Sequence, residues 1–433
     1  MSHRTVSPPR ELSVDAYRVC AAVLIVVGHW LAASITYHDG QFTRQNALVE
    51  LPWTQWLTLI FQVVPVFFLV AGFASAASWS RRGASSLPEW LTTRYRAVLG
   101  PTAAYVVVMW VAVGALIVTG FDADLRALSG WAVGMHLWFI PMYLALVGMT
   151  PLAVSAHRRW GLWVPVVLAA AVAAVDAVSL SGWIPGLGWA NNVLCWAAIY
   201  QLGIAWHFGA IRRLWAAVLA LGAAGVMAVA IGFGPYPVSM IGVPGQVVQN
   251  SAPPSIVMLA LGAAQAGALI AAAPSVTRWL RKSRLKHALA VVNSRVMLLY
   301  LWHMVGVVVV TVVAYPLGLF PQPTLGSVDW WLSRVLWVIV LSLVTAGLLA
   351  IVGWGRSALA ASLFSVPVRL PGTWSSVALL IGTGMAAVAL WRISLDGFAP
   401  AGRFPVSTAL VFACGVALAS LRSVRAVQQL SSA

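Results

Sequence analysis

The sequence predicts an all-α polytopic membrane protein of about twelve transmembrane helices, in which a ten-helix core is followed by two C-terminal helices. Composition is the first observation: 61% of the residues are hydrophobic and only 8% are charged, whereas a soluble domain carries about 25% charged residues. The second is a series of apolar segments of roughly 18 to 26 residues, long enough to cross a hydrocarbon core about 30 Å thick. The third is a bias of basic residues toward alternate loops.

The apolar segments define the expected helices in chain order. They cover about residues 14–35, 55–78, 97–119, 133–154, 161–179, 190–208, 213–233, 255–273, 290–315, 331–352, 375–393 and 405–421.

The basic residues orient these segments. If the N-terminus is cytoplasmic and the spans alternate, the 26 Lys and Arg residues fall on the cytoplasmic side with the exception of Arg44, Arg126, Arg334, Arg392 and Arg403. Because Lys and Arg accumulate in cytoplasmic loops, we expect a multi-pass protein of the plasma (cytoplasmic) membrane with both termini in the cytoplasm. The same rule explains the net charge of +16, so we do not interpret it as a nucleic-acid-binding surface.

The segments outside the membrane are short. Residues 1–13 form a polar, basic cytoplasmic tail, and the absence of a small-residue cleavage site indicates that the first helix is retained. The two longest extracytoplasmic segments, about 36–54 and 234–254, are expected to cap the helix bundle. Several prolines in the second one argue against a helix there.

Common site signatures are missing from the sequence. The three cysteines, Cys20, Cys195 and Cys414, are far apart in apolar segments, so we interpret them as buried thiols and expect neither a disulfide nor a metal site. The sequence contains no glycine-rich phosphate loop, no His-Glu-x-x-His and no Gly-x-Ser-x-Gly.

The first predicted helix carries the strongest functional signal. Arg18 and His29 are eleven residues apart, which is about three helical turns, so both lie on one helix face and about 16 Å apart along the axis. Asp15 can pair with Arg18 on the same face. An ion pair at a helix end is an ordinary alternative for these two residues, but ionisable groups inside a membrane are functional candidates by default.

The ninth predicted helix carries a second histidine at a similar depth. It runs in the same direction as the first, and His303 lies about as far from its cytoplasmic start as His29 lies from the start of the first helix. Arg295 precedes it near the cytoplasmic end. A single His303 would be read as a packing residue, but together with His29 it is interpreted as part of one site.

The fourth predicted helix runs inward and places His136 near the outer surface. His136, Trp138 and Tyr143 can line a pocket for an acceptor, because aromatic faces suit sugar-like or amphipathic ligands. The alternative is an aromatic belt at the membrane interface, which Trp commonly forms.

Two arginines of the cytoplasmic side extend into the third predicted helix. Arg94 and Arg96 can bind phosphate as forked donors. The basic cluster of residues 281–286 is better explained by topology or by contacts with anionic lipid.

Taken together and in this order, these residues resemble acyltransferase family 3 of membrane proteins. The first helix has the family's arginine, ten intervening residues and histidine. The other matching pieces are Val64 to Phe73, with a proline, two aromatics and a glycine, then Arg94, Arg96, Pro101, Leu137 to Phe139, Tyr143, Leu144 and Tyr300 to His303. The resemblance covers about residues 10–355, and it implies a ten-helix acyltransferase domain at 14–355.

The chain departs from the family pattern in two places. Ala71 stands where a serine is expected before Gly72, which we expect to affect packing rather than chemistry. Residues 356–433 add two transmembrane helices and a cytoplasmic tail, and we expect this pair to lie outside the catalytic bundle.

The resemblance implies transfer of an acetyl or other short acyl group from acyl-CoA, with acetyl-CoA as the expected co-substrate. The acceptor would be a hydroxyl of a glycan, glycolipid or lipid-linked molecule, and some relatives acylate small secondary metabolites. We expect His29 and His303 to be catalytic, with His29 as general base. Arg18, Arg94 and Arg96 would bind the CoA phosphates.

The acceptor would contact aromatic and histidine side chains, and no metal is expected. The expected contacts are His136, Trp138, Tyr143, Tyr300 and Trp302. Membrane lipid is the only other expected partner. An alternative is a transporter of a lipid-linked or anionic solute, with His29 as its proton site and Arg18 as its anion site; the lack of an internal repeat disfavours it.

Overall fold

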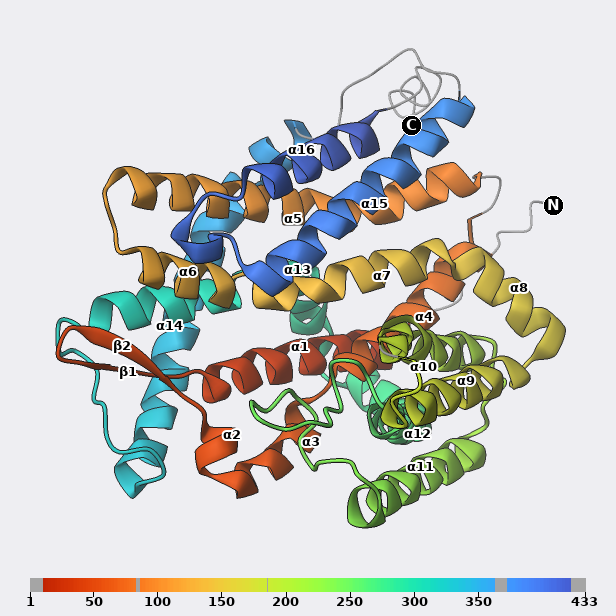
Figure 1. Ribbon diagram of the computed structural model, residues 1–433. Helices are drawn as coiled ribbons and strands as arrows, with labels where there is room; N and C mark the ends of the chain where they lie inside the picture. Colours follow the sequence, from red (N-terminus) through yellow and green to blue (C-terminus); the bar gives the residue numbers. More distant parts are fainter. Residues whose placement is uncertain (1–10, 83–85, 185, 363–371, 422–433) are drawn as a thin grey trace. The chain divides into compact units, whose positions relative to one another are not determined.

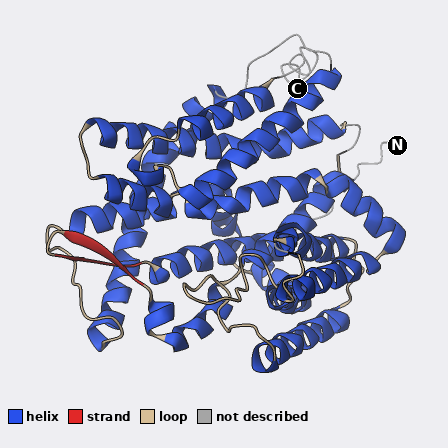
Figure 2. Ribbon diagram, in the orientation of Figure 1, coloured by secondary structure: helices blue, strands red, loops and turns tan. Residues whose placement is uncertain are grey.

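The computed structural model describes residues 11–82, 86–184, 186–362 and 372–421 (Figure 1). Within them the chain is helical except for loops and one two-stranded hairpin (Figure 2). Ten segments of the described residues are long and apolar enough to cross a membrane. The protein is therefore an all-α, multi-pass membrane protein, which confirms the predicted fold class.

The chain divides into two compact units, which are described separately. The first comprises Met1–Ile25, Trp56–Ser78 and Leu152–Val296, and the second comprises Val26–Gln55, Trp79–Pro151 and Met297–Ala433. The helices that begin in the first half of the chain are α1 (Leu12–Ala32), α2 (Ala47–Glu50), η1 (Pro52–Leu57), α3 (Thr58–Phe61), α4 (Val64–Ser80), α5 (Leu87–Val118), α6 (Ala123–Ala132), η2 (Met135–Trp138), α7 (Phe139–Gly148), α8 (Thr150–Trp160), α9 (Trp163–Leu180), η3 (Leu187–Ala190), α10 (Asn191–His207) and α11 (Arg213–Phe233).

The remaining helices follow a long loop. They are α12 (Ile256–Lys282), α13 (Leu285–Ala314), α14 (Val328–Ser362), α15 (Gly372–Asp396), η4 (Pro400–Gly402) and α16 (Val406–Ser420). Ten of the twelve predicted segments correspond to candidate membrane spans. The other two are α10 and α16, which have 17 and 15 residues and are short for a span.

The second predicted segment is interrupted, because α3 ends at Phe61 and α4 begins at Val64. Pro65 lies in the first turn of α4, where a missing N–H costs no hydrogen bond.

Close backbone contact between α4 and α10 holds part of the first unit together. A Cβ added to Gly72 would lie 2.0 Å from the Tyr200 carbonyl oxygen, and one added to Gly203 would lie 2.0 Å from the Leu69 carbonyl oxygen. Small residues let transmembrane helices approach this closely. The glycine that follows Ala71 therefore serves packing.

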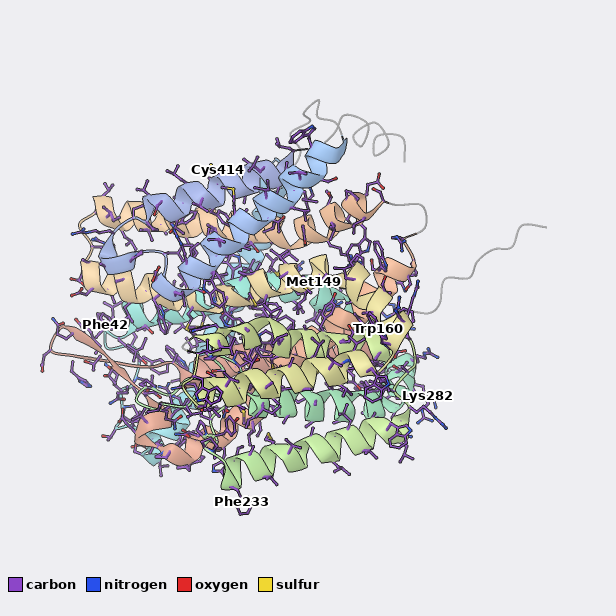
Figure 3. The ribbon with its side chains drawn as sticks, turned by 45° about the vertical axis from the view of Figure 1, so that its right-hand side comes forward. Phe42, Met149, Trp160, Phe233, Lys282 and Cys414 are labelled. Carbon is purple, nitrogen blue, oxygen red and sulfur yellow. The ribbon has the colours of Figure 1, made fainter. Side chains whose placement is uncertain are left out.

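The loop between α11 and α12 contains no helix, as its prolines predicted. Asp176 of α9 fixes both ends of this loop, since it accepts 2.8 Å hydrogen bonds from the Tyr236 hydroxyl and the Ile256 N–H. Phe233 ends α11 and Lys282 ends α12, and the two residues lie at opposite ends of this unit (Figure 3).

The second unit contains the hairpin, which the sequence analysis did not predict. Strands β1 (Ser34–His38) and β2 (Gln41–Gln45) pair antiparallel. Asp39 and Gly40 join them with φ angles of 50° and 79°, the left-handed conformation that favours Asp-Gly in two-residue turns. The segment that follows α1 is thus an ordered hairpin with a short helix and not only a cap of loops.

The C-terminal pair α15 and α16 packs inside the second unit, which corrects the expectation that it lies outside the bundle. The two helices lie side by side (Figure 1), and α15 also contacts η2, α7, α6 and α5. Leu390, Ile393 and Phe398 are buried in one core cluster with Tyr105 of α5 and Leu137 of η2. Apolar residues on the inner faces of both helices drive this packing, and hydropathy alone does not reveal their partners.

The cysteines are free thiols, but they are not all buried. Cys195 is buried, whereas Cys20 and Cys414 are exposed on their helices.

Candidate functional site

Two histidines meet in the interior of the second unit. His29 lies near the end of α1 and His303 lies in the middle of α13. His29 Nδ1 is 2.8 Å from His303 Nε2, and the two rings stack with centroids 5.1 Å apart. His303 is fully buried, whereas His29 is half-buried, so His29 is the member of the pair that a substrate can reach.

The backbone of α13 fixes the tautomer of this pair. His303 Nδ1 lies 2.8 Å from the Tyr300 carbonyl oxygen, which can only accept, so Nδ1 of His303 carries the proton. In a neutral imidazole the other nitrogen is then an acceptor, and His303 Nε2 must accept from the Nδ1–H of His29. The Nε2 atom of neutral His29 is therefore unprotonated and available as a base.

Indole groups fix the backbone around both histidines. The Trp30 indole donates to the His303 carbonyl oxygen at 3.0 Å, and the Trp337 indole donates to the Trp30 carbonyl oxygen at 2.9 Å. Arg334 donates to the Ala33 carbonyl oxygen at 3.1 Å. The Trp337 and Arg334 donors satisfy carbonyls at the C-terminal end of α1, where intrahelical partners are lacking, and the Trp30 indole ties α1 to the backbone of α13.

A third histidine joins the pair. His136 of η2 is only 3% exposed, and its ring centroid lies 5.0 Å from that of His303 and 5.1 Å from that of Tyr300. The Tyr300 hydroxyl donates to the His136 carbonyl oxygen. Neither ring nitrogen of His136 makes a hydrogen bond with a described residue. His136 is therefore buried beside the two catalytic candidates and does not lie in an exposed aromatic belt.

The predicted aromatic contacts fall into two groups. Trp138, Tyr143 and Tyr300 are half-buried and surround Phe139, with ring centroids 6.4, 5.9 and 5.7 Å from the Phe139 ring. Trp302 is instead buried in the core with its ring edge-on to another aromatic side chain. The first group can contact an acceptor, while Trp302 is placed to pack.

Arg18 takes part in a polar cluster of the first unit. Its Nη1 lies 3.4 Å from the Asn293 Oδ1 and 4.0 Å from the Asp15 Oδ1, and the Asn293 amide donates to Asp15 at 3.0 Å. The Arg18 side chain is 30% exposed. Both contacts involve Nη1, so the other N–H groups of the Arg18 guanidinium remain available. Arg18 can therefore still bind an anion.

Arg94 and Arg96 belong to the second unit and are half-buried. The Arg94 guanidinium lies 5.8 Å from the centre of the Trp90 ring. Arg96 donates to the Ser420 carbonyl oxygen at 3.4 Å, a carbonyl at the C-terminal end of α16, and its Nε makes no hydrogen bond with a described residue.

Sequence reasoning missed the residues that support the histidines. Tyr105 of α5 is fully buried between His136 and Trp302, and its hydroxyl donates to the Val133 carbonyl oxygen at 2.7 Å. Tyr105 and Trp337 are aromatic residues in apolar segments. Nothing in the neighbouring sequence distinguishes them from aromatic residues that face lipid. Among the described residues, no three His, Cys, Asp or Glu side chains are grouped so as to hold a metal ion.

Comparison with known proteins gives one match. The family model described as "Acyltransferase domain", that of acyltransferase family 3, matches residues 11–353. No curated protein and no solved structure matches the chain.

Proposed function

Because the chain belongs to acyltransferase family 3, we propose that it transfers an acetyl or other short acyl group from cytoplasmic acyl-CoA to a hydroxyl. The acceptor is carbohydrate-containing or lipid-linked and is acylated within or across the plasma membrane, with both termini of the enzyme in the cytoplasm. The observation that carries this proposal is the hydrogen bond between His29 and His303, because it leaves one imidazole nitrogen free to accept a proton.

The proposed step is general-base catalysis. His29 Nε2 takes the proton of the acceptor hydroxyl as its oxygen attacks the thioester carbonyl, and the C–S bond breaks as the C–O bond forms. The CoA thiolate then receives that proton from the His29 imidazolium and leaves as the thiol. During the step His303 keeps its acceptor nitrogen on His29 Nδ1–H, and a hydrogen bond from a charged donor is stronger than a neutral one.

The other candidate residues are assigned to binding. Arg18, Arg94 and Arg96 bind the phosphates of the donor, for which forked guanidinium donors are suited. The aromatic group of Trp138, Tyr143 and Tyr300 contacts the acceptor, and His136, which is buried against His303 and Tyr300, supports these side chains from behind. In an alternative route the same unprotonated Nε2 of His29 attacks the thioester carbonyl, the C–S bond breaks and CoA leaves as the thiolate. The acceptor hydroxyl then takes the acyl group from the acyl-histidine, and its proton goes to the CoA thiolate.

The proposal is tested by His29→Ala, with His207→Ala as the matched control. His207 is also half-buried in an apolar helix, but it belongs to α10 of the first unit. Removing a general base lowers the rate by about 10²–10⁴, and the control should keep the wild-type rate. The assay is release of CoA thiol from acetyl-CoA by purified protein in lipid nanodiscs, and mass spectrometry of a brief reaction detects any acylated histidine. A well-folded His29→Ala protein with the wild-type rate would exclude this mechanism.

A further inference from the structure

The chain continues for two helices beyond the part that matches the family. The first of them, α15, contacts η2, the turn that carries His136. Contacts between α15 and η2, and between η4 and α6, are among the main contacts of this region. The segment that makes them is 393–402, from the end of α15 through η4, and is called the junction below.

The backbone of the junction contacts the backbone of the segment that leads into η2. Phe398 N–H donates to the Gly130 carbonyl oxygen at 3.1 Å. A Cβ on Gly134, the residue before η2, would lie 2.9 Å from the Ile393 carbonyl oxygen. Gly397 has a φ of +80°, and a Cβ there would lie 2.6 Å from the Trp131 nitrogen. Larger residues at these glycines would push the junction away from the turn that carries His136.

An aromatic contact extends the junction toward His136. Phe398 is fully buried, and its ring lies 6.0 Å from the Tyr105 ring, which it meets edge-on. Tyr105 in turn lies 6.2 Å from the His136 ring and donates a hydrogen bond to the Val133 carbonyl oxygen. Phe398 thus supports the side chain that packs against both His136 and the residue before Gly134.

His136 depends on this support. Its ring nitrogens make no hydrogen bond with a described residue, so no directional bond of the ring itself fixes its position. Its place beside His303 and Tyr300 is determined by the backbone of η2 and by packing.

From these contacts we infer that the junction is a positioning element for acyl transfer. It holds the η2 turn so that His136 stays packed against His303 and Tyr300, and the histidine pair keeps its geometry. This inference rests on the proposed function for its catalytic meaning, although the positioning itself is measurable without activity. A displacement of about 1 Å in a residue that orients a substrate can cost roughly 10²-fold in rate.

The test uses full-length Phe398→Ala and Gly134→Ala, each with a matched control. Phe412→Ala removes a ring that is also almost fully buried, but this ring contacts Trp110. Gly384→Ala adds a methyl group on α15 where nothing lies within 4 Å. Phe398→Leu keeps apolar volume and provides a folded variant if Phe398→Ala unfolds.

Two readouts are measured on each purified protein in nanodiscs. Thiol release from acetyl-CoA gives kcat and KM, and hydrogen exchange gives the protection of residues 130–142. Phe398→Ala and Gly134→Ala are expected to lower kcat about ten- to a hundredfold with KM for acetyl-CoA unchanged, and to speed exchange in 130–142. Phe398→Leu should recover part of kcat, and both controls should match wild type in kcat and in this segment.

Wild-type kcat and wild-type exchange in 130–142 for both test variants would overturn the inference, as would an equal loss of kcat in Phe412→Ala. If wild-type protein releases no more thiol than His29→Ala, the proposed function fails. The exchange data then still decide whether the junction holds the η2 turn.

Discussion

Replacement of His303 by Ala tests whether His303 sets the protonation state of His29. In the structure His303 Nε2 accepts from His29 Nδ1–H at 2.8 Å, and its own Nδ1–H is held by the Tyr300 carbonyl oxygen. Without the His303 imidazole, either ring nitrogen of His29 can face the hydroxyl of the acyl acceptor. The His29 imidazolium also loses the hydrogen bond that it donates to His303. A hydrogen bond to a charged group contributes about 1.5–3 kcal/mol. At about 1.4 kcal/mol for each factor of ten, kcat should fall roughly ten- to a hundredfold.

The assay is thiol release from acetyl-CoA as a function of acetyl-CoA concentration, because the mechanism predicts a loss of kcat without a change in KM. His303→Gln supplies an amide oxygen that can accept from His29, so it should be faster than His303→Ala. His303→Leu fills the space without an acceptor and should resemble His303→Ala. Equal rates for the wild-type, Gln and Leu proteins, with all of them folded, would refute the assignment of His303.

The remaining predictions concern the donor, the support of α1 and pH. Arg18→Ala should raise KM for acetyl-CoA, and Arg18→Lys should rescue it only in part because an ammonium lacks the planar fork; equal binding of CoA and dephospho-CoA by wild-type and Arg18→Ala proteins would make Arg18 structural. Trp337→Phe removes the indole donor to Trp30 and should lower kcat while leaving the unfolding temperature nearly unchanged. A lower unfolding temperature with wild-type kcat would show that Trp337 only packs. Burial lowers the pKa of His157 below its ordinary value. The stability that this neutral histidine contributes is therefore present above about pH 6.5 and is lost as the pH falls below that value. His157→Gln should flatten the acid side of the curve of unfolding temperature against pH, and an unchanged curve would contradict this.

Hydropathy predicted most of the fold because the membrane leaves few alternatives. Every backbone polar group in the hydrocarbon core must be satisfied within its own segment, so a long apolar run is a helix whatever surrounds it. The bounds of α10 and α16 were predicted less well, since these helices have 17 and 15 residues and are shorter than the segments predicted for them. Hydropathy did not predict the hairpin, although Asp39-Gly40 is a local turn signal that could have been used.

The similar depth of His29 and His303 could be predicted because it depends on helix geometry, whereas their contact depends on α1 packing against α13. Both lie on apolar helices of fixed rise and, in the predicted topology, of the same direction, so equal sequence offsets give equal depths. The position of His136 could not be predicted in this way. It lies on a 3-10 turn between α6 and α7, and the direction in which such a turn points is decided by what packs around it. Trp302 shows the same limit, since its place in a core cluster depends on Tyr105.

The hydrogen-bond partner of His29 is an imidazole, and this affects how readily His29 gives up a proton. In many hydrolases a carboxylate orients the catalytic histidine and stabilises its imidazolium. Here the orienting group is another imidazole, His303, which is neutral in the resting pair because its Nε2 must accept. A neutral acceptor stabilises a charged donor less than a carboxylate does. In the proposed mechanism the CoA thiolate must recover the proton that the acceptor hydroxyl gave up, so a base that releases its proton readily suits this transfer.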